Sequence, residues 1–240
     1  MEILDRSEVL KQQKLNHFNQ FASDVVMSFL YNGGVDATAL NLANEKRVDF
    51  GVDTQWNADG SITPTAHHPT VNVGLTTGAV DLDSQDSIFI MEFKPKQSLS
   101  TTKKTFLALL GSGKGIHVET GDYSNELQVW YRTDYNNDKQ NINDLDHAKK
   151  YSVVVHWEHA TQKTYVYVNG VLRIEDEITT FKSGSGIGLD QLKVGLGLSG
   201  STMYHQALII GKNNTPYTAE QVASIVANPY QLYQTEDDAR

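Results

Sequence analysis

Residues 151–174 read YSVVVHWEHATQKTYVYVNGVLRI and contain three runs rich in valine, tyrosine and isoleucine. Residues of these types favour extended strands. The first two runs are separated by His159-Ala160-Thr161-Gln162, a typical hairpin separation, and the next two by Asn169-Gly170. Asn-Gly between apolar runs is the strongest short-range signal for a β-hairpin turn. This stretch therefore predicts three consecutive antiparallel strands.

Further strands are expected on both sides of this stretch. Residues 87–93, SIFIMEF, form a nearly continuous apolar run closed by Pro95, which is typical of a central strand covered on both faces. Shorter apolar or alternating runs follow at residues 105–110, 115–119, 192–198 and 207–210. Gly111-Ser-Gly-Lys-Gly115 lacks the full phosphate-loop spacing and is interpreted as a hairpin turn.

In residues 127–132, alternation places Leu127, Val129 and Tyr131 toward a core and Gln128, Trp130 and Arg132 outward. Trp157 is assigned to the core and Trp56 to loop packing.

The two ends of the chain are expected to be helical. Residues 1–20 are rich in helix formers, and Phe18, Phe21, Val25 and Phe29 recur at helical spacing before a first strand near residues 25–31. This helix either packs on the sandwich or acts as a tether or oligomer contact. Near the other end, Thr218 begins a capping-box sequence, ThrAlaGluGln, that predicts a short helix ending before Asn228-Pro229.

Many short strands with helices only at the ends predict an all-β fold, a two-sheet antiparallel jelly-roll sandwich. We expect residues 1–30 to form an N-terminal helical attachment segment and residues 31–240 to form the jelly-roll domain.

Composition narrows the functional classes. No stretch approaches the roughly eighteen apolar residues of a membrane span, and the opening MEILDRSEVLKQQK lacks the regions of a secretory signal. The chain has no cysteine, which excludes disulfides and thiolate metal sites and suits a reducing compartment. A formal net charge of −9, from 29 acidic and 20 basic residues, would repel a nucleic-acid backbone.

Residues 87–233 resemble the laminin G-like branch of the concanavalin A-like lectin/glucanase superfamily. The resemblance lies in IleMetGluPheLysPro at 90–95, TyrSerValValValHisTrp at 151–157, TyrValTyrValAsnGly at 165–170, ValGlyLeuGly at 194–197 and the closing residues 218–233. Residues 224–233, SIVANPYQLY, are also similar to endings of bacteriophage and prophage proteins that carry this domain.

The resemblance implies a non-enzymatic virion protein, a head decoration, fibre or tail-associated component whose jelly roll displays a surface for glycans. Its expected partners are other virion proteins, reached through the N-terminal segment, and its expected location is a virion assembled in the bacterial cytoplasm. Homo-oligomerisation is compatible with such a role. The alternatives are a glycan lyase or glucanase on the same fold and a freestanding lectin.

Catalytic patterns are missing from the sequence. Glucan-cleaving members of the superfamily carry Glu-x-Asp-x-x-Glu on one strand, which places alternate carboxylates on one face. Glu119, Asp122 and Glu126 straddle a glycine, and residues 175–177 put consecutive carboxylates on opposite faces. Both groups are interpreted as solvated charge, so no catalytic residue is expected.

A metal site has one candidate. Asp134, Asn136 and Asp138 offer alternate oxygen ligands like the first half of a calcium loop. Lys139 and Leu145 occupy the positions where an EF-hand needs its glycine and its bidentate glutamate. The pattern favours a solvated polar loop, with calcium binding as the alternative.

Sugar binding needs an exposed aromatic ring with polar groups nearby. Trp130 and Arg132 share the outward face of their strand, with Tyr123 and Tyr135 in the flanking loops. These four residues are the predicted carbohydrate site, and burial of Trp130 under another element is the competing interpretation.

Overall fold

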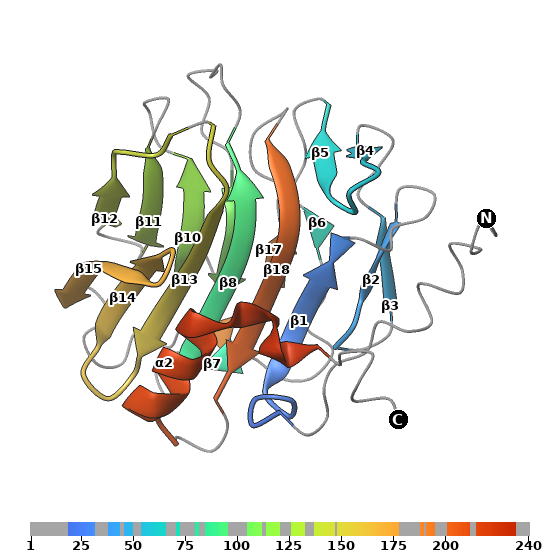
Figure 1. Cartoon of the computed structure of the whole chain (residues 1–240). Coiled ribbons are helices and arrows are strands. Elements are labelled where there is room, and N and C mark those ends of the chain that lie inside the picture. Colours follow the sequence, from blue (N-terminus) through green and yellow to red (C-terminus); the bar gives the residue numbers. More distant parts are fainter. Residues whose placement is uncertain are drawn as a thin grey trace.

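The chain forms a sandwich of two antiparallel β-sheets with a short helix near the C-terminus (Figure 1). This computed structural model describes residues 19–31, 38–43, 46–49, 54–65, 71–72, 80–81, 85–95, 105–111, 114–120, 126–132, 137–146, 148–177, 188–189, 191–194, 201–211 and 215–233. The expected all-β sandwich is therefore confirmed.

The larger sheet has eight strands in the described residues. Its order is β15-β14-β13-β8-β18-β5-β4, and β1 also pairs with β18. Strands far apart in sequence are neighbours here, as a jelly roll requires. The strands are β1 (Val25–Leu30), β4 (Thr54–Trp56), β5 (Ile62–Pro64), β8 (Ser87–Lys94), β13 (Tyr151–Glu158), β14 (Lys163–Val168), β15 (Val171–Glu177) and β18 (Thr202–Ile210).

The second sheet has six strands in the described residues, in the order β12-β11-β10-β9-β17-β6. Two separate strand pairs, β2 with β3 and β7 with β16, lie outside both sheets. The strands of the second sheet are β6 (Val71–Asn72), β9 (Thr105–Gly111), β10 (Lys114–Thr120), β11 (Leu127–Arg132), β12 (Asn137–Ile142) and β17 (Gln191–Val194). The small pairs consist of β2 (Thr38–Asn41), β3 (Lys46–Asp49), β7 (Val80–Asp81) and β16 (Gly188–Leu189).

The main core lies between the two sheets. Alternate residues of β8 and β13, such as Phe89, Met91 and Val155, meet Leu127 and Val129 of the opposite sheet there. Trp157 belongs to this core and is 2% exposed, as the sequence predicted. Trp56 instead lies in β4 and packs half-buried against the same core.

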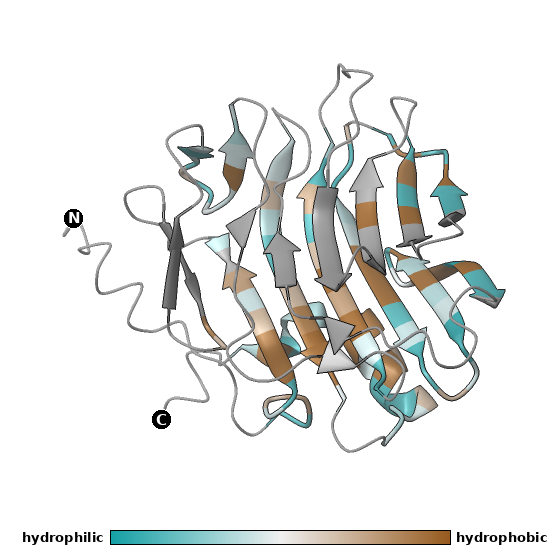
Figure 2. Ribbon diagram, turned by 180° about the vertical axis from the view of Figure 1, so that it is seen from behind, coloured by the Kyte–Doolittle hydropathy of each residue, from teal (hydrophilic) through white to brown (hydrophobic). Residues whose placement is uncertain are grey.

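A second core covers the outer face of the eight-stranded sheet. The remaining residues of β8, β13 and β18, such as Ile90, Val154 and Ile209, pack there with Val222 and Ile225 of α2 (Ala219–Ala227). The 3₁₀-helix η3 (Pro229–Leu232) continues this cover through Leu232. Because both faces of β8 are covered, its sequence is nearly all apolar, and Figure 2 shows the longest hydrophobic stretches on the central strands of this sheet.

The predicted turns are confirmed. β13 and β14 pair across residues 159–162, and β14 pairs with β15 across Asn169 and Gly170. Both turn residues have positive φ, 50° and 78°, as a type I′ turn requires. Gly111 pairs with Lys114, which confirms the hairpin interpretation of the glycine-rich segment between β9 and β10.

The expected helix at 218–227 is confirmed, and its cap has the predicted chemistry. The Thr218 hydroxyl accepts from the backbone N–H of Gln221, and the Gln221 side chain accepts from the backbone N–H of Thr218. No helix among the described residues is long and apolar enough to cross a membrane.

The strand expected near residues 25–31 is confirmed as β1, but the helical spacing assigned to Phe21, Val25 and Phe29 needs a correction. Residues 1–18 lie outside the described part of the chain, but Phe21 lies in a turn, and Val25 and Phe29 lie in β1. β1 pairs with β18 over five positions, from Val25 with Ile209 to Leu30 with His205. The last part of the predicted attachment segment, residues 1–30, is therefore a strand of the sandwich. A spacing of four residues is even, so it suits one face of a strand as well as one face of a helix.

Candidate functional site

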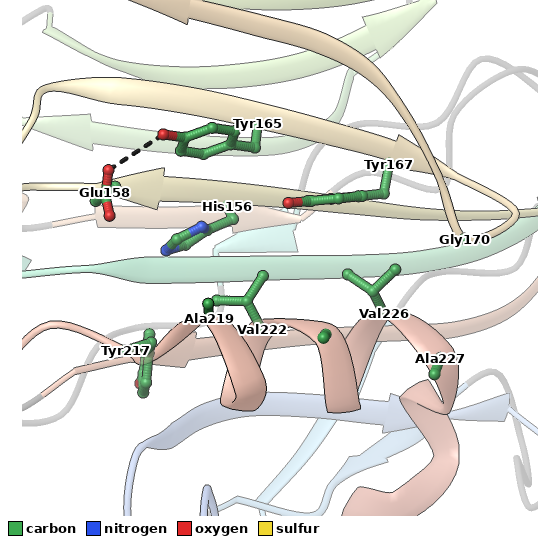
Figure 3. Close-up of a pocket in the computed structure, with 11 residues that line it drawn as sticks. His156, Glu158, Tyr165, Tyr167, Gly170, Tyr217, Ala219, Val222, Val226 and Ala227 are labelled. Atoms are coloured by element: carbon green, nitrogen blue, oxygen red, sulfur yellow. Dashed lines mark hydrogen bonds between the residues drawn. The ribbon is translucent and has the colours of Figure 1, made fainter.

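A groove of about 610 Å³ lies between helix α2 and the outer face of β13 and β14 (Figure 3). One wall consists of side chains of the two strands and the other of small side chains of the helix, and Tyr217, which precedes the helix, also lines the groove. The strand wall includes His156, Glu158, Tyr165 and Tyr167, and Gly170 closes one end.

The strand wall follows from the two-residue repeat of a β-strand. On β14, Val166 and Val168 face the main core, so Tyr165 and Tyr167 project from the opposite face toward α2. The burial pattern of β14 alternates strictly between half-buried and buried residues. The repeating TyrValTyrVal sequence therefore builds an aromatic wall.

His156 and Glu158 complete the polar side of the groove. The imidazole of His156 stacks on the ring of Tyr165, with 5.6 Å between ring centroids and an interplanar angle of 20°. The Tyr165 hydroxyl donates to Oε2 of Glu158 at 3.2 Å, and the Thr161 hydroxyl donates to the same oxygen. Burial raises the pKa of Tyr165, and the neighbouring Glu158 charge raises it further, so Tyr165 remains a donor.

Asp86 fixes the end of the groove at which Glu158 lies. Its carboxylate accepts from the backbone N–H of His159 at 2.8 Å and from that of Tyr217 at 2.9 Å. Burial alone would raise the pKa of Asp86, but the nearby His156 and the two backbone donors outweigh it and hold the pKa below its usual value. Asp86 therefore joins the β13–β14 turn to the start of α2.

The imidazole of His156 packs against Tyr165, but one of its nitrogen atoms makes no hydrogen bond to a described residue. Its Nε2 lies 3.7 Å from Oδ2 of Asp86, beyond ordinary hydrogen-bond distance. This nitrogen is buried and has no hydrogen-bond partner among the described residues, and the residue is only 4% exposed. The groove thus contains one buried polar atom whose hydrogen-bonding capacity is unused.

The helical wall has no polar side-chain atoms. It consists of Ala219, Val222, Ala223, Val226 and Ala227. Its position follows from the Thr218 capping box and from Val222, which packs into the second core.

The described lining of the groove has few acidic side chains. The carboxylate of Glu158 is the one acidic side chain among its described lining residues, so these residues do not form the pair of carboxylates that glycoside cleavage uses. No cluster of three or more potential metal ligands occurs in the described parts of the chain.

The structure describes only part of the predicted carbohydrate site. Trp130 and Arg132 lie in β11, as expected, but the structure does not describe their side chains, and Tyr123 and Tyr135 lie outside the described residues. Gln128, expected to face outward with Trp130, is fully buried, so the outward face of β11 is covered at that position.

The predicted calcium loop is placed in part as well. Asp134 and Asn136 lie outside the described residues. Asp138 lies in β12, where it pairs with Tyr131 of β11. The second half of the expected loop, from residue 137 onward, is therefore regular strand.

This groove was not predicted from the sequence. The alternation of Tyr165 and Tyr167 with buried valines was a usable signal for an aromatic face. The position of α2 over that face depends on contacts between segments more than 50 residues apart, and no local pattern encodes such contacts.

No protein-family model and no curated protein sequence matches the chain. Solved structures with a similar fold include the receptor-binding domain of botulinum neurotoxin D, with a TM-score of 0.67, 11% identity and coverage of 88% of this chain and 54% of that one. Another is a Trypanosoma rangeli sialidase in complex with the inhibitor DANA, with a TM-score of 0.60, 10% identity and coverage of 84% of this chain and 32% of that one. The chain thus spans about half the length of the neurotoxin domain. At these identities the similarity shows a shared β-sandwich fold.

Proposed function

We propose that this chain is a non-enzymatic, glycan-binding β-sandwich protein that serves as a structural component of a bacteriophage virion. The observation that carries the glycan-binding part is the groove with Tyr165, Tyr167 and Glu158. Aromatic rings pack against the C–H face of a sugar, and a carboxylate accepts hydrogen bonds from its hydroxyls.

The similar folds support the same proposal. They include a receptor-binding domain and a sialidase in complex with an inhibitor, so the sandwich occurs in proteins that engage receptors or glycans. The virion part rests on the sequence resemblance of residues 224–233 to endings of phage proteins. In this proposal the partners are other virion proteins, reached through the N-terminal segment, and the position is a head decoration, fibre or tail component.

The glycan-binding part is tested with a glycan array, comparing the wild-type protein with Tyr167→Ala. Tyr167 is half-buried and lines the groove, so its truncation should abolish specific binding without unfolding the sandwich. Tyr204→Ala is a matched control, because Tyr204 is also half-buried but lies on β18 outside the groove lining. A blank array from folded wild-type protein would contradict glycan binding.

A glycan-processing enzyme is the second candidate, favoured by one observation. His156 lies beside both Asp86 and Tyr165 in the groove, and histidine and tyrosine can transfer protons in polysaccharide cleavage. Incubation with the oligosaccharides that bind, followed by mass spectrometry, separates the two functions. Intact ligand after prolonged incubation supports the binding protein, whereas His156-dependent cleavage supports the enzyme.

A further inference from the structure

We infer that the groove between α2 and β13–β14 selects neutral sugars that carry an N-acetyl group and rejects sugars that carry a carboxylate. This inference rests on the proposed glycan-binding function and specifies its ligand class. Three features of the groove carry it: free hydrogen-bonding atoms on the strand side, the sign of the charge and the apolar helical wall.

The strand wall offers free polar atoms. Tyr167 is half-buried and its hydroxyl has no hydrogen-bond partner among the described residues. Glu158 accepts both of its hydrogen bonds, from Tyr165 and Thr161, through Oε2, so Oε1 can accept from a ligand. Figure 3 shows the Tyr165 and Tyr167 rings on the same side of the groove, opposite the helix. A sugar ring lying along these tyrosines can donate hydroxyls to Glu158 and bond to the Tyr167 hydroxyl.

The charge of the groove is negative. Glu158 contributes a carboxylate, and no lysine or arginine belongs to the described lining. The nearby Lys163 ammonium is engaged with Glu175 of β15 at 2.7 Å. A uronic or sialic acid would bring its carboxylate toward Glu158 without a cation in the described lining to compensate, and such unpaired like charges oppose binding.

The helical wall distinguishes among neutral sugars. Ala219, Ala223 and Ala227 recur every four residues and therefore lie on one face of α2. These short side chains leave room for a methyl group but provide no polar atom. A sugar hydroxyl directed at this wall would lose its hydrogen bonds to water, whereas an acetamido methyl group would bury apolar surface.

The test uses four tetrasaccharides. Three share a β-1,4 backbone and differ at carbon 2: the tetramers of N-acetylglucosamine, glucose and glucosamine. The fourth, a hyaluronan tetrasaccharide, alternates N-acetylglucosamine with glucuronate. Calorimetry should show the N-acetylglucosamine tetramer binding at least about tenfold more tightly than the glucose tetramer, with no measurable binding of hyaluronan.

Two variants assign the preference to this groove. Ala223→Leu keeps a strong helix former on the exposed side of α2 but fills the space by the wall, so affinity for the N-acetylglucosamine tetramer should fall at least about tenfold at an unchanged melting temperature. Glu158→Gln should reduce the difference in affinity between the N-acetylglucosamine tetramer and hyaluronan. Glu220→Gln removes the same charge from an exposed position of α2 outside the lining and should change neither result.

The outcomes separate this inference from the function on which it rests. Equal or tighter binding of the glucose tetramer, or preferential binding of hyaluronan, overturns the ligand class while leaving glycan binding intact. If none of the four binds, array binding confined to sugars without an N-acetyl group, or to N-acetylated sugars that carry a carboxylate, also overturns it. Neutral N-acetylated hits of another linkage support it. An array without any specific hit overturns the proposed function itself.

Discussion

The side chain of Asn19 donates a hydrogen bond to the backbone carbonyl of Gln231 at 3.0 Å, although 212 positions separate the two residues. A second link lies close by, where the hydroxyls of Ser28 and Tyr233 approach to 2.6 Å inside the protein. The first and last described segments of the chain therefore lie in contact with each other. The segment before β1 and the segment after α2 stabilise each other.

These contacts predict different outcomes for two N-terminal deletions. Removing residues 1–18 keeps β1 and its pairing with β18, so the shortened protein should still fold as a sandwich. Removing residues 1–30 eliminates β1 together with Phe21 and Phe29, both fully buried. Each lost aromatic core side chain costs about 3–5 kcal/mol, comparable with the roughly 5–15 kcal/mol that stabilises a whole domain. Circular dichroism and thermal unfolding of both variants provide the measurement.

The shorter deletion also tests the attachment hypothesis. A protein that lacks residues 1–18 and remains folded should fail to join its virion if this segment is the tether. Normal incorporation of that variant into particles would show that the attachment lies elsewhere.

The turn between β14 and β15 gives a second prediction. Gly170 has a φ of 78°, and a Cβ atom added there would meet no other atom within 4 Å. The cost of Gly170→Ala is therefore backbone strain alone, roughly 1 kcal/mol of unfolding free energy. Gly170→Asn should cost less, because asparagine adopts the left-handed conformation more readily than alanine does. Urea unfolding of both variants checks the order, and equal stability of the alanine variant and the wild type would contradict it.

Local signals in the sequence predicted the turns and the helix cap correctly, because single residues determine these features. Asn169-Gly170 requires positive φ, and Thr218 with Gln221 supplies its own hydrogen bonds. Such local signals do not determine which strands pair across the sheet. β18 lies between β8 and β1, and that order depends on the burial of whole faces.

The first strand was predicted correctly, but periodicity misled the assignment of Phe21, Val25 and Phe29 to a helix. Phe21, Val25 and Phe29 are four residues apart, a spacing that suits one face of a helix or of a strand. A register shift between Val25 and Met27 then leaves Val25 in the second core and turns Met27 and Phe29 to the main core. A bulge of this kind leaves no clear trace in hydrophobic spacing.

A third prediction concerns His205, which is fully buried between Tyr230 and Tyr233, with 5.1 Å and 5.2 Å between ring centroids. Burial, with a smaller contribution from the charge of Lys150, lowers the pKa of His205 to about 3. The unfolded chain binds this proton near pH 6.5, so the contribution of neutral His205 to stability is lost as the pH falls from about 6.5 toward 3. Between pH 7.5 and pH 5 the loss is about 2 kcal/mol.

Replacing His205 with phenylalanine should remove this pH dependence. Neither ring nitrogen has a hydrogen-bond partner among the described residues, so His205→Phe removes buried polar atoms while keeping an aromatic ring between the two tyrosines. We expect a melting temperature at pH 7.5 close to that of the wild type and a smaller decrease at pH 5. An identical decrease in both proteins would show that other groups cause the acid sensitivity.

The last prediction addresses Asp86, whose two carboxylate oxygens each accept one backbone hydrogen bond, from His159 and from Tyr217. Asp86→Asn replaces one of these acceptors with an amide that donates, so one buried N–H loses its partner. The expected cost is about 1–3 kcal/mol of unfolding free energy.

Because the two bonds hold the β13–β14 turn against the start of α2, the groove should also bind its ligand more weakly. Hydrogen exchange should accelerate at the amide of His159 or at that of Tyr217, whichever faces the new side-chain NH₂ group. The amide of Gly211 is an internal control. It donates a hydrogen bond of 2.8 Å to the backbone carbonyl of Asp86, and the substitution preserves this carbonyl. Faster exchange at all three amides would indicate general loosening of the sheet, and unchanged exchange at His159 and Tyr217 would refute the role assigned to the carboxylate.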